Sequence, residues 1–244
     1  MAVYAFVFPG QGSQSVGMGQ DLAQAFSSAR TVFEEVDDAL GENLSKIIFE
    51  GPADNLTSTE NTQPALMAVS MAVLRVLETE GGLDLASTAT LLAGHSLGEY
   101  AALAAARSLG VAQTAKLLRL RGQAMQKAVP AGEGGMAALI GATLEQAEDI
   151  ATQASQTALV EIANDNGGGQ IVLSGRMAGI DAAIALAKEL KIKRAVKLPV
   201  SAPFHSSLMK PAEIIMAEAL EQATIAAPIV PVIANVTALR ETDA

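Results

Sequence analysis

The chain has 244 residues, of which 50% are hydrophobic and 17% are charged, so it can bury a large core in one domain with an insertion or in two small domains. A formal net charge of -10 argues against a nucleic-acid-binding protein, which normally has a basic excess. The sequence contains no cysteine, which excludes disulfides, thiolate metal ligands and a cysteine nucleophile. The opening residues lack the basic start of a secretory signal, and no stretch reaches the roughly 20 apolar residues of a membrane span. We therefore expect a cytoplasmic protein without a membrane partner.

Short apolar runs alternate with helical patterns along the chain, an order typical of an α/β fold with a parallel sheet. The first predicted strand covers residues 3–8 and ends in the glycine-rich loop "PGQGSQSVGMG", after which a helical pattern begins near Asp21. Residues 63–80 form a predicted helix that Pro64 opens. Residues 88–93 form a predicted strand that leads to Ser96, and another helix follows at once.

The pattern changes between Gly132 and Pro199. It reads strand, helix, strand, strand, helix, strand, at residues 136–141, 143–155, 158–163, 170–174, 176–190 and 194–199. This is the βαββαβ order of a ferredoxin-like unit. The sequence therefore predicts an α/β protein in which an α/β-hydrolase-like body with a parallel sheet, residues 1–131 and 200–244, carries an inserted ferredoxin-like βαββαβ subdomain, residues 132–199.

Ser96 lies in "GHSLG" (94–98), a G-x-S-x-G frame directly after a predicted strand. Between a strand and a helix, the two glycines permit a tight reversal that presents the serine hydroxyl at the carboxyl edge of the sheet and at a helix N-terminus. Serine is also a favoured helix N-cap. The motif alone therefore leaves two roles open for Ser96, a nucleophile and a cap.

A serine nucleophile needs a base, and the chain contains two histidines, His95 and His205. His95 is the immediate neighbour of Ser96, and adjacent side chains in a tight turn point apart. His205 follows a strand-like run and precedes a helix, a junction from which a base can reach the same sheet edge. We expect His205 to be the general base, and the alternative is a histidine packed in a loop.

Acyl transfer also needs backbone N–H donors for the developing oxyanion. We expect one donor at Leu97, directly after Ser96, and the other at Gln11, in the loop that ends the first strand. The glycines of this loop also suggest a phosphate cradle. Because the loop lacks the G-K-[ST] ending and an acidic ribose partner, nucleotide binding is disfavoured.

Arg121 lies in "TAKLLRLRGQAMQKAV", a predicted helix. At about 100° per residue, it falls in the middle of the apolar stripe, whereas Arg119 shares a side with Lys116, Gln123 and Gln126, which predicts a solvated face. An inward guanidinium requires a partner. An internal carboxylate is one alternative, and with Ser96 25 residues earlier, a carboxylate on the substrate is the preferred one.

The chain resembles the bacterial malonyl-CoA:acyl-carrier-protein transacylases of fatty-acid synthesis from Phe6 to its last residue. The resemblance rests on seven landmarks: "FPGQGSQ" (8–14), "TQPA" (62–65), "GHSLGEY" (94–100), Arg121 in "LRLRGQAM", Asn166 and Gln170 before "IVLSG", "PFHSSLMKPA" (203–212) and "NVT" (235–237).

The resemblance implies a ping-pong transfer in which Ser96 attacks the thioester of malonyl-CoA, with His205 as base, and holds the malonyl group as an ester. The phosphopantetheine thiol of acyl carrier protein then accepts this group. The resemblance also implies that Arg121 pairs with the malonyl carboxylate and that Gln11 and Leu97 form the oxyanion hole. Gln63, Asn166, His95 and Phe204 complete the expected substrate-binding residues, and neither a metal nor another cofactor is implied.

The sequence departs from the family in two places. The family's usual proline after Asn166 is glycine here, in "NDNGGGQ", which predicts a more mobile edge of the pocket. Members of the family also continue past the position of Ala244, and the segment that orients the histidine is expected to lie in that continuation.

Two other functions are open from the sequence. A serine hydrolase of the α/β type, such as a thioesterase, would need a third acidic triad member, for which Asp165 and Asp181 are candidates, and would not need an inward arginine. A module that only binds carrier protein predicts loss of Ser96 or His205, and both are present.

A basic cluster lies at residues 187–197, "AKELKIKRAVK". The carrier protein of this pathway is acidic, so two acidic proteins would have to meet through a local basic patch. We expect Lys188, Lys191, Lys193, Arg194 and Lys197 to dock it, and the alternative is a solvated helix end whose cations favour the helix C-terminus. We expect the protein to be a monomer.

Overall fold

The computed structural model describes residues 4–200 and 202–244, so position 3 of the first predicted strand lies outside it. The chain divides into two compact units. The first comprises Met1–Gly122 and Glu218–Ala244, and the second comprises Gln123–Ala217. Among the described residues, no helix is long and apolar enough to cross a membrane.

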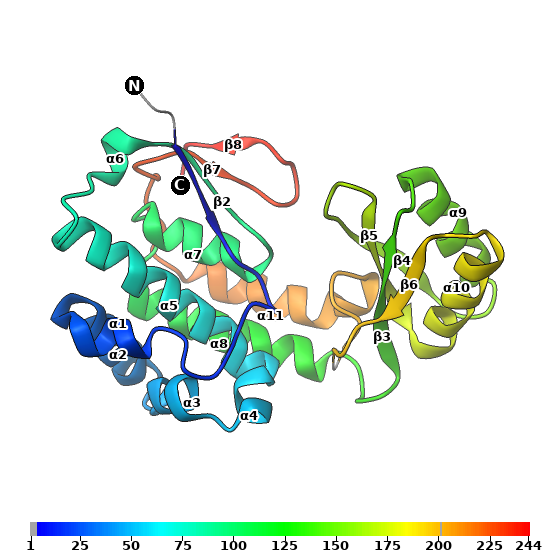
Figure 1. The fold of residues 1–244 in the computed structure, drawn as a ribbon, viewed down its shortest axis with the longest axis horizontal. Helices are drawn as coiled ribbons and strands as arrows, with labels where there is room; N and C mark the ends of the chain where they lie inside the picture. The colour runs from blue at the N-terminus through cyan, green and yellow to red at the C-terminus, as the bar shows by residue number, and fades with distance from the viewer. Residues whose placement is uncertain (1–3, 201) are drawn as a thin grey trace. The chain divides into compact units, whose positions relative to one another are not determined.

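The first unit contains a four-stranded sheet in the order β1-β2-β7-β8 (Figure 1). Strands β1 (Tyr4–Phe8), β2 (Ala89–Gly94) and β7 (Val232–Ile233) are parallel, and the short β8 (Arg240–Glu241) runs antiparallel to β7. Phe8 pairs with Gly94, and Ala93 pairs with Ile233. The three parallel strands therefore end at nearly the same level, which brings the loops after them to one edge.

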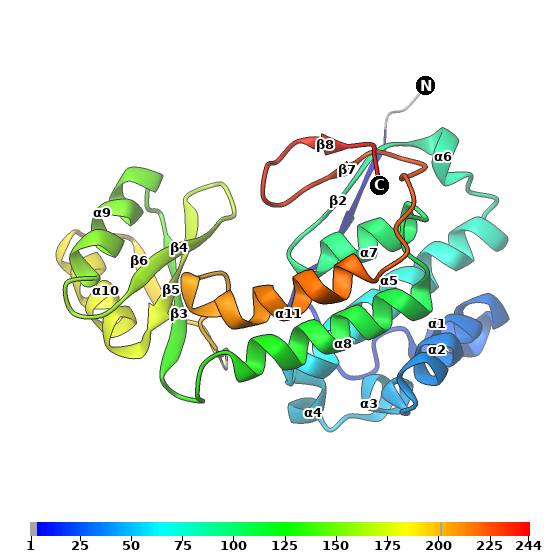
Figure 2. The ribbon, with the colours of Figure 1, turned by 180° about the vertical axis from the view of Figure 1, so that it is seen from behind.

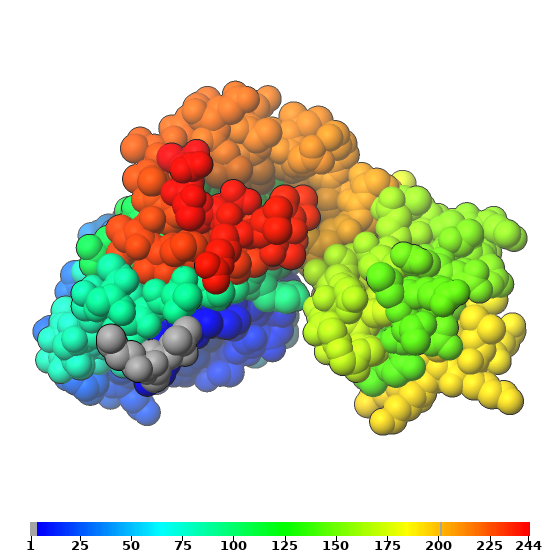
Figure 3. Space-filling model, turned by 90° about the horizontal axis from the view of Figure 1, so that it is seen from above, coloured from blue at the N-terminus to red at the C-terminus, as the bar shows by residue number. Residues whose placement is uncertain are grey.

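The helices of this unit are α1 (Gln20–Ala25), α2 (Ser27–Leu40), α3 (Leu44–Glu50), α4 (Ala53–Thr57), α5 (Thr59–Thr79), α6 (Leu85–Thr88), α7 (Leu97–Ala105) and α8 (Val111–Lys127), whose last turn lies in the second unit. Helix α7 packs against this sheet, and most of the other helices of the unit pack on α5 and on one another. Met67, Leu92, Leu97 and Leu118 are fully buried among them in one apolar cluster. Figure 3 shows the C-terminal residues, in red, on the surface of this unit.

Pro64 does not open its helix, because α5 begins at Thr59 and contains Pro64 in its interior. The prediction of a start near residue 63 was therefore wrong. Proline removes one intrahelical hydrogen bond. Tertiary packing outweighs this local cost, since the first turns of α5 bury Gln63, Ala65 and Met67 almost completely.

The second unit contains an antiparallel sheet in the order β4-β5-β3-β6. Its elements are β3 (Gly134–Ile140), α9 (Leu144–Ala154), β4 (Val160–Asp165), β5 (Gln170–Arg176), α10 (Met177–Glu189) and β6 (Arg194–Lys197). This is the predicted βαββαβ arrangement, and the fold class predicted from the sequence is confirmed. The compact unit extends beyond residues 132–199, because it also takes in the short helix η1 (Ser207–Met209) and the start of α11 (Lys210–Glu221).

Both faces of this second sheet are covered. Ala137 and Leu139 of β3 pack in a cluster with residues of α9 and α10, which lie together on one face of the sheet (Figure 2). The alternate residues Met136 and Ala138 pack in another cluster, with Phe204. The period of two along a strand explains why consecutive residues of β3 face opposite clusters.

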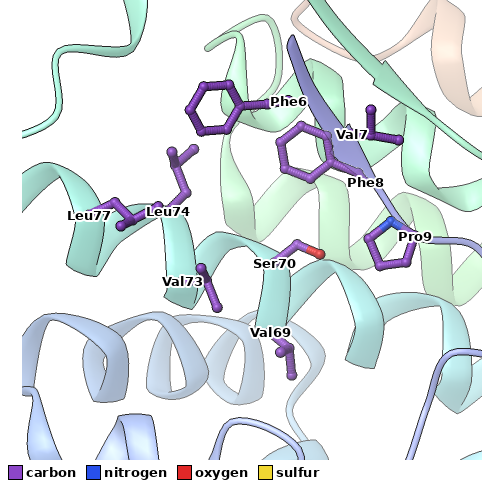
Figure 4. A pocket seen from close by; sticks show the side chains of 9 residues that line it. All are labelled: Phe6, Val7, Phe8, Pro9, Val69, Ser70, Val73, Leu74 and Leu77. Carbon is purple, nitrogen blue, oxygen red and sulfur yellow. The ribbon is translucent and has the colours of Figure 1, made fainter. Parts of the chain in front are cut away.

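Strand β1 is one edge of the first sheet, and an apolar groove runs along it (Figure 4). The groove has a volume of about 300 Å³. Phe6, Val7, Phe8 and Pro9 line one side of it, and α5 lines the other with Val69, Ser70, Val73, Leu74 and Leu77. Val7 is 72% exposed, which is unusual for an apolar residue in a parallel strand.

Candidate active site

Ser96 lies at the turn from β2 into α7, with φ 56° and ψ -108°. A non-glycine residue in such a conformation costs about 1–3 kcal/mol. The flanking glycines make the turn possible because a side chain at Gly94 would overlap the backbone of Gly98, and one at Gly98 would overlap the carbonyl oxygen of Phe8. Although Ser96 is the N-cap residue of α7, its side chain makes no capping hydrogen bond. Its hydroxyl instead accepts a hydrogen bond from Arg121.

The guanidinium of Arg121 lies beside this hydroxyl. Arg121 Nη2 donates to Ser96 Oγ at 3.1 Å, and Arg121 Nη1 donates to Gln63 Oε1 at 2.7 Å. The ring of Tyr100 lies under the guanidinium, with the ring centroid 5.7 Å from Cζ. Among the residues that the structure describes, Arg121 forms no ion pair with a carboxylate. Burial lowers the pKa of Arg121, and the neighbouring Tyr100 and Glu99 partly oppose this shift.

Three elements bring this group together. Gln63 comes from α5 and is buried, Arg121 comes from α8, and Ser96 starts α7. Helices α5 and α8 approach closely beside Arg121, since a side chain at Gly122 would meet the backbone of Thr59 and Glu60. The site therefore holds a half-buried cation whose direct hydrogen-bond partners are neutral, with the charge of Glu99 nearby.

The two expected oxyanion donors lie in the same unit. Leu97 is the first residue of α7, so its N–H has no partner within the helix. Gln11 follows β1, and its side-chain Nε2 donates to Thr59 Oγ1 at 3.4 Å. The loop before Gln11 lies against the turn that contains Ser96, because His95 N donates to Phe8 O at 3.1 Å and a side chain at Gly10 would meet the ring of His95. His95 itself is exposed.

Asn235, which has no predicted role beyond its place in "NVT", contacts the turn at Ser96 directly. Its Oδ1 accepts the N–H of Ser96 at 2.8 Å, and its Nδ2 donates to the carbonyl of Gly94 at 2.7 Å. Its own N–H donates to Glu99 Oε1 at 3.3 Å. No local pattern links residues 139 positions apart in the chain, so only the pairing of β7 with β2 reveals this contact.

Glu99 and Tyr100 are two further residues of the site without an assigned role in the sequence analysis. Burial raises the pKa of Glu99, while the hydrogen bond from Asn235 and the charge of Arg121 lower it, and Glu241 raises it. Burial also raises the pKa of the Tyr100 phenol. Both lie three or four positions after Ser96 in "GHSLGEY". Residues one helical turn apart share a face of the helix, so this spacing is a sequence signal for both residues.

The remaining candidates lie in the second unit. His205 has φ 59° and stands in the loop before η1. The loop is held by Glu161, whose Oε2 accepts the N–H of Ser207 at 2.6 Å. Phe204 is buried in the cluster with Met136. Asn166 is exposed in the turn between β4 and β5, where its N–H donates to Gln170 O at 2.9 Å.

Arg119 is not on a solvated face, so that prediction was wrong. Its side chain is only 11% exposed, and Nη2 pairs with Glu42 Oε2 at 2.9 Å. Nη1 also donates to Asn61 Oδ1. Glu42 follows α2 and Asn61 lies in α5, and these segments cover the side of α8 that the helical pattern assigned to solvent. Lys116, on that side, is exposed as expected.

All five residues of the basic cluster are exposed in the second unit. Lys197 pairs with Asp181 at 2.5 Å. Asp165, the other acidic candidate of the hydrolase alternative, accepts the N–H of Gly167 at 2.9 Å. Across the described residues, no group of three or more histidine or acidic side chains is placed to hold a metal ion.

Comparison with known proteins identifies the family. Residues 5–243 match the family described as "Acyl transferase domain". The malonyl CoA-acyl carrier protein transacylase of Bacillus subtilis is 46% identical over 239 residues, which are 98% of this chain and 74% of the relative.

Two solved structures are also similar. The acyl-carrier-protein-S-malonyltransferase of Bartonella henselae superposes with a TM-score of 0.96 at 57% identity, over 100% of this chain and 77% of that one. A malonyl-transacylase in complex with a type II PKS acyl-carrier protein superposes with a TM-score of 0.94 at 41% identity, over 99% of this chain and 77% of that one. The chain therefore belongs to the acyl transferase domain family.

Proposed function

We propose that this protein transfers the malonyl group from malonyl-CoA to the phosphopantetheine thiol of an acyl carrier protein, through a malonyl ester of Ser96. This reaction supplies extender units for fatty-acid synthesis in the cytoplasm. The relatives that support this assignment are named malonyl CoA-acyl carrier protein transacylases.

The contact between Arg121 and Ser96 carries the proposal. In a malonyl thioester, one methylene separates the carboxylate from the carbonyl carbon that the nucleophile attacks. A cation that binds this carboxylate therefore has to lie close to the nucleophile. Arg121 Nη2 lies 3.1 Å from Ser96 Oγ. A guanidinium can bind a carboxylate with two hydrogen bonds, and Gln63 orients it at Nη1.

The first half-reaction forms the ester. Ser96 Oγ attacks the thioester carbonyl while its proton passes to His205, the proposed general base. The N–H groups of Gln11 and Leu97 stabilise the oxyanion. The C–S bond then breaks, and coenzyme A leaves as a thiol that takes the proton from His205.

The second half-reaction reverses these steps with another thiol. The phosphopantetheine thiol gives its proton to His205 and attacks the ester carbonyl, and Ser96 Oγ leaves and recovers the proton. All steps use side chains and N–H groups of the chain, so we propose no metal and no other cofactor. Asn166, His95 and Phe204 remain predicted to line or support the acyl pocket.

An intact-mass experiment tests the proposed function. Incubation with malonyl-CoA should produce a malonyl adduct that maps to Ser96, and addition of holo acyl carrier protein should remove it. Ser96→Ala should form no adduct, because the chain has no cysteine to replace the serine. Free malonate without transfer to carrier protein would indicate a thioesterase instead. An adduct on the Ser96→Ala protein would disprove the nucleophile.

We further propose that a monomer of this protein docks the acidic carrier protein on the exposed cluster of Lys188, Lys191, Lys193, Arg194 and Lys197. The cations would offset the repulsion expected from a net charge of -10. Reversing Lys191 and Lys193 to Glu should raise the KM for carrier protein and weaken its salt dependence, while acylation by malonyl-CoA stays nearly unchanged. Equal loss in both half-reactions would instead indicate a structural role for the cluster.

A further inference from the structure

Asn235 follows β7 at the edge of the sheet where the nucleophile lies. Because β7 pairs with β2 in parallel and Ile233 lies opposite Ala93, a residue two positions further along reaches the level of the nucleophile turn. Figures 1 and 2 both show β7 beside β2, with α7 next to them. The register of the sheet thus places Asn235 beside Ser96.

The side chain of Asn235 bridges the two sides of this turn. Its oxygen accepts the N–H of Ser96 at 2.8 Å, while its nitrogen donates to the carbonyl of Gly94 at 2.7 Å. A carboxamide can donate and accept at the same time, whereas a carboxylate only accepts. The site therefore uses both functions of an asparagine.

Glu99 fixes the backbone of Asn235 from the other direction. The N–H of Asn235 donates to Glu99 Oε1 at 3.3 Å, and Glu99 lies in the first turn of α7, directly after the nucleophile. The strand end, the nucleophile turn and the helix are thus joined through one residue. A strained backbone conformation like that of Ser96 persists only where several surrounding contacts hold it in place.

The hydrogen bond to Asn235 also makes the N–H of Ser96 differ from the N–H of Leu97, the next residue. Asn235 occupies the N–H of Ser96, whereas the N–H of Leu97 makes no hydrogen bond to another described residue. An oxyanion donor has to be fixed in direction before the reaction starts. By holding Ser96, Asn235 fixes the direction of the next N–H as well.

We infer that Asn235 is a positioning residue for acyl transfer, which holds Ser96 and the N–H of Leu97 in their reactive geometry. This inference rests on the proposed function for its effect on rate, but the contact itself can be tested without turnover. The hydrogen bond should protect the Ser96 amide from hydrogen exchange, whatever reaction the protein performs.

Three variants test the inference. Asn235→Ala removes both hydrogen bonds of the side chain, and Asn235→Asp keeps the shape and the acceptor but loses the donor to Gly94. Thr237→Ala is the matched control, because Thr237 lies in the same hairpin and its side chain bonds within it, to Leu239 and Glu241. The measurements are the exchange rate of the Ser96 amide by NMR, the single-turnover rate of malonyl-ester formation and the KM for malonyl-CoA.

We expect the Ser96 amide of Asn235→Ala to exchange at least about 10-fold faster, and ester formation to slow by roughly 10- to 100-fold, as small misplacements at a reacting centre do. The KM for malonyl-CoA should change by less than about twofold, since Arg121 remains in place. Asn235→Asp should also slow ester formation, and it keeps the test valid if the alanine variant does not fold. Thr237→Ala should behave as the wild type.

Unchanged exchange at Ser96 in a folded Asn235→Ala protein would overturn the inference, and so would a loss of activity confined to KM. Failure of the proposed function has a different signature. In that case the wild-type protein forms no malonyl ester, while exchange at the Ser96 amide still depends on Asn235.

Discussion

Arg119 and Arg121 lie two positions apart on α8, and Arg119 is buried while Arg121 is half-buried, but their partners also differ. Arg119 pairs with Glu42 and bonds to Asn61. Arg121 bonds to the neutral Gln63 and Ser96 over the ring of Tyr100. The charge of Arg119 is paired directly within the protein, whereas we propose that the malonyl carboxylate pairs with Arg121. Burial of an arginine therefore does not by itself indicate function, and the charge of its partners does.

Replacing Arg121 by alanine should have the largest effect. Loss of one partner of a buried ion pair costs about 3–5 kcal/mol, so the rate of malonyl-ester formation should fall by roughly 10²- to 10⁴-fold. Acetyl transfer should rise relative to malonyl transfer, because an uncharged acyl group no longer enters beside a buried cation. The measurement is the ratio of the two transfer rates. A fall in malonyl transfer with an unchanged ratio would indicate that Arg121 is structural.

Gln63→Glu should make Arg121 resemble Arg119. The new carboxylate would lie where Oε1 now accepts from Nη1 at 2.7 Å, and would balance the charge internally. A hydrogen bond to a charged group contributes about 1.5–3 kcal/mol, so malonyl-ester formation should fall by about 10- to 100-fold. The melting temperature of the Gln63→Glu protein should not fall. Malonyl transfer at the wild-type rate would contradict the inference that the charge of the partners distinguishes Arg121 from Arg119. Gln63→Met, which removes the acceptor without adding charge, is the control.

Glu42→Gln should change stability and not selectivity. It removes the charge that balances Arg119, but Glu42 is 56% exposed, so solvent screens the pair. We expect a loss of about 1 kcal/mol, which corresponds to a fall of about 2–4 °C in Tm for a chain of this size. Urea unfolding and the acetyl-to-malonyl ratio are the two measurements. A changed ratio would show that Arg119 also takes part in substrate selection. Glu133→Gln, which breaks an exposed pair with Arg176, is the control.

Much of the fold was predictable because it depends on local patterns. The alternation of short apolar strands with helices gave the βαββαβ order, and the apolar stripe of α8 placed Arg121 inward. The errors and omissions depend on distant segments. Arg119 was assigned to solvent because its partners, Glu42 and Asn61, lie 77 and 58 residues earlier. The contact between Asn235 and Ser96 has the same origin, since it depends on the pairing of two strands.

Glu99 should give the smallest effect, visible as a dependence of stability on pH. Burial raises its pKa in the folded protein above the ordinary value of 4.5, so the folded state holds this proton more tightly than the unfolded state. The resulting stabilisation is complete below the ordinary pKa and is lost as the pH rises through the raised pKa. Glu99→Gln removes this loss while keeping an acceptor for Asn235. The gain in its free energy of unfolding, relative to the wild type, should therefore grow with pH.

Urea unfolding of both proteins at several pH values between about 4 and 8 measures this difference over the range in which a raised carboxyl pKa acts. Glu148→Gln, at an exposed position of α9, shows whether removal of any carboxylate gives the same trend. A difference that shrinks as the pH rises would mean that Arg121 and Asn235 stabilise the Glu99 carboxylate more than burial destabilises it. Glu99 would then balance the charge of Arg121, and the contrast between Arg121 and Arg119 would be weaker than their direct contacts indicate.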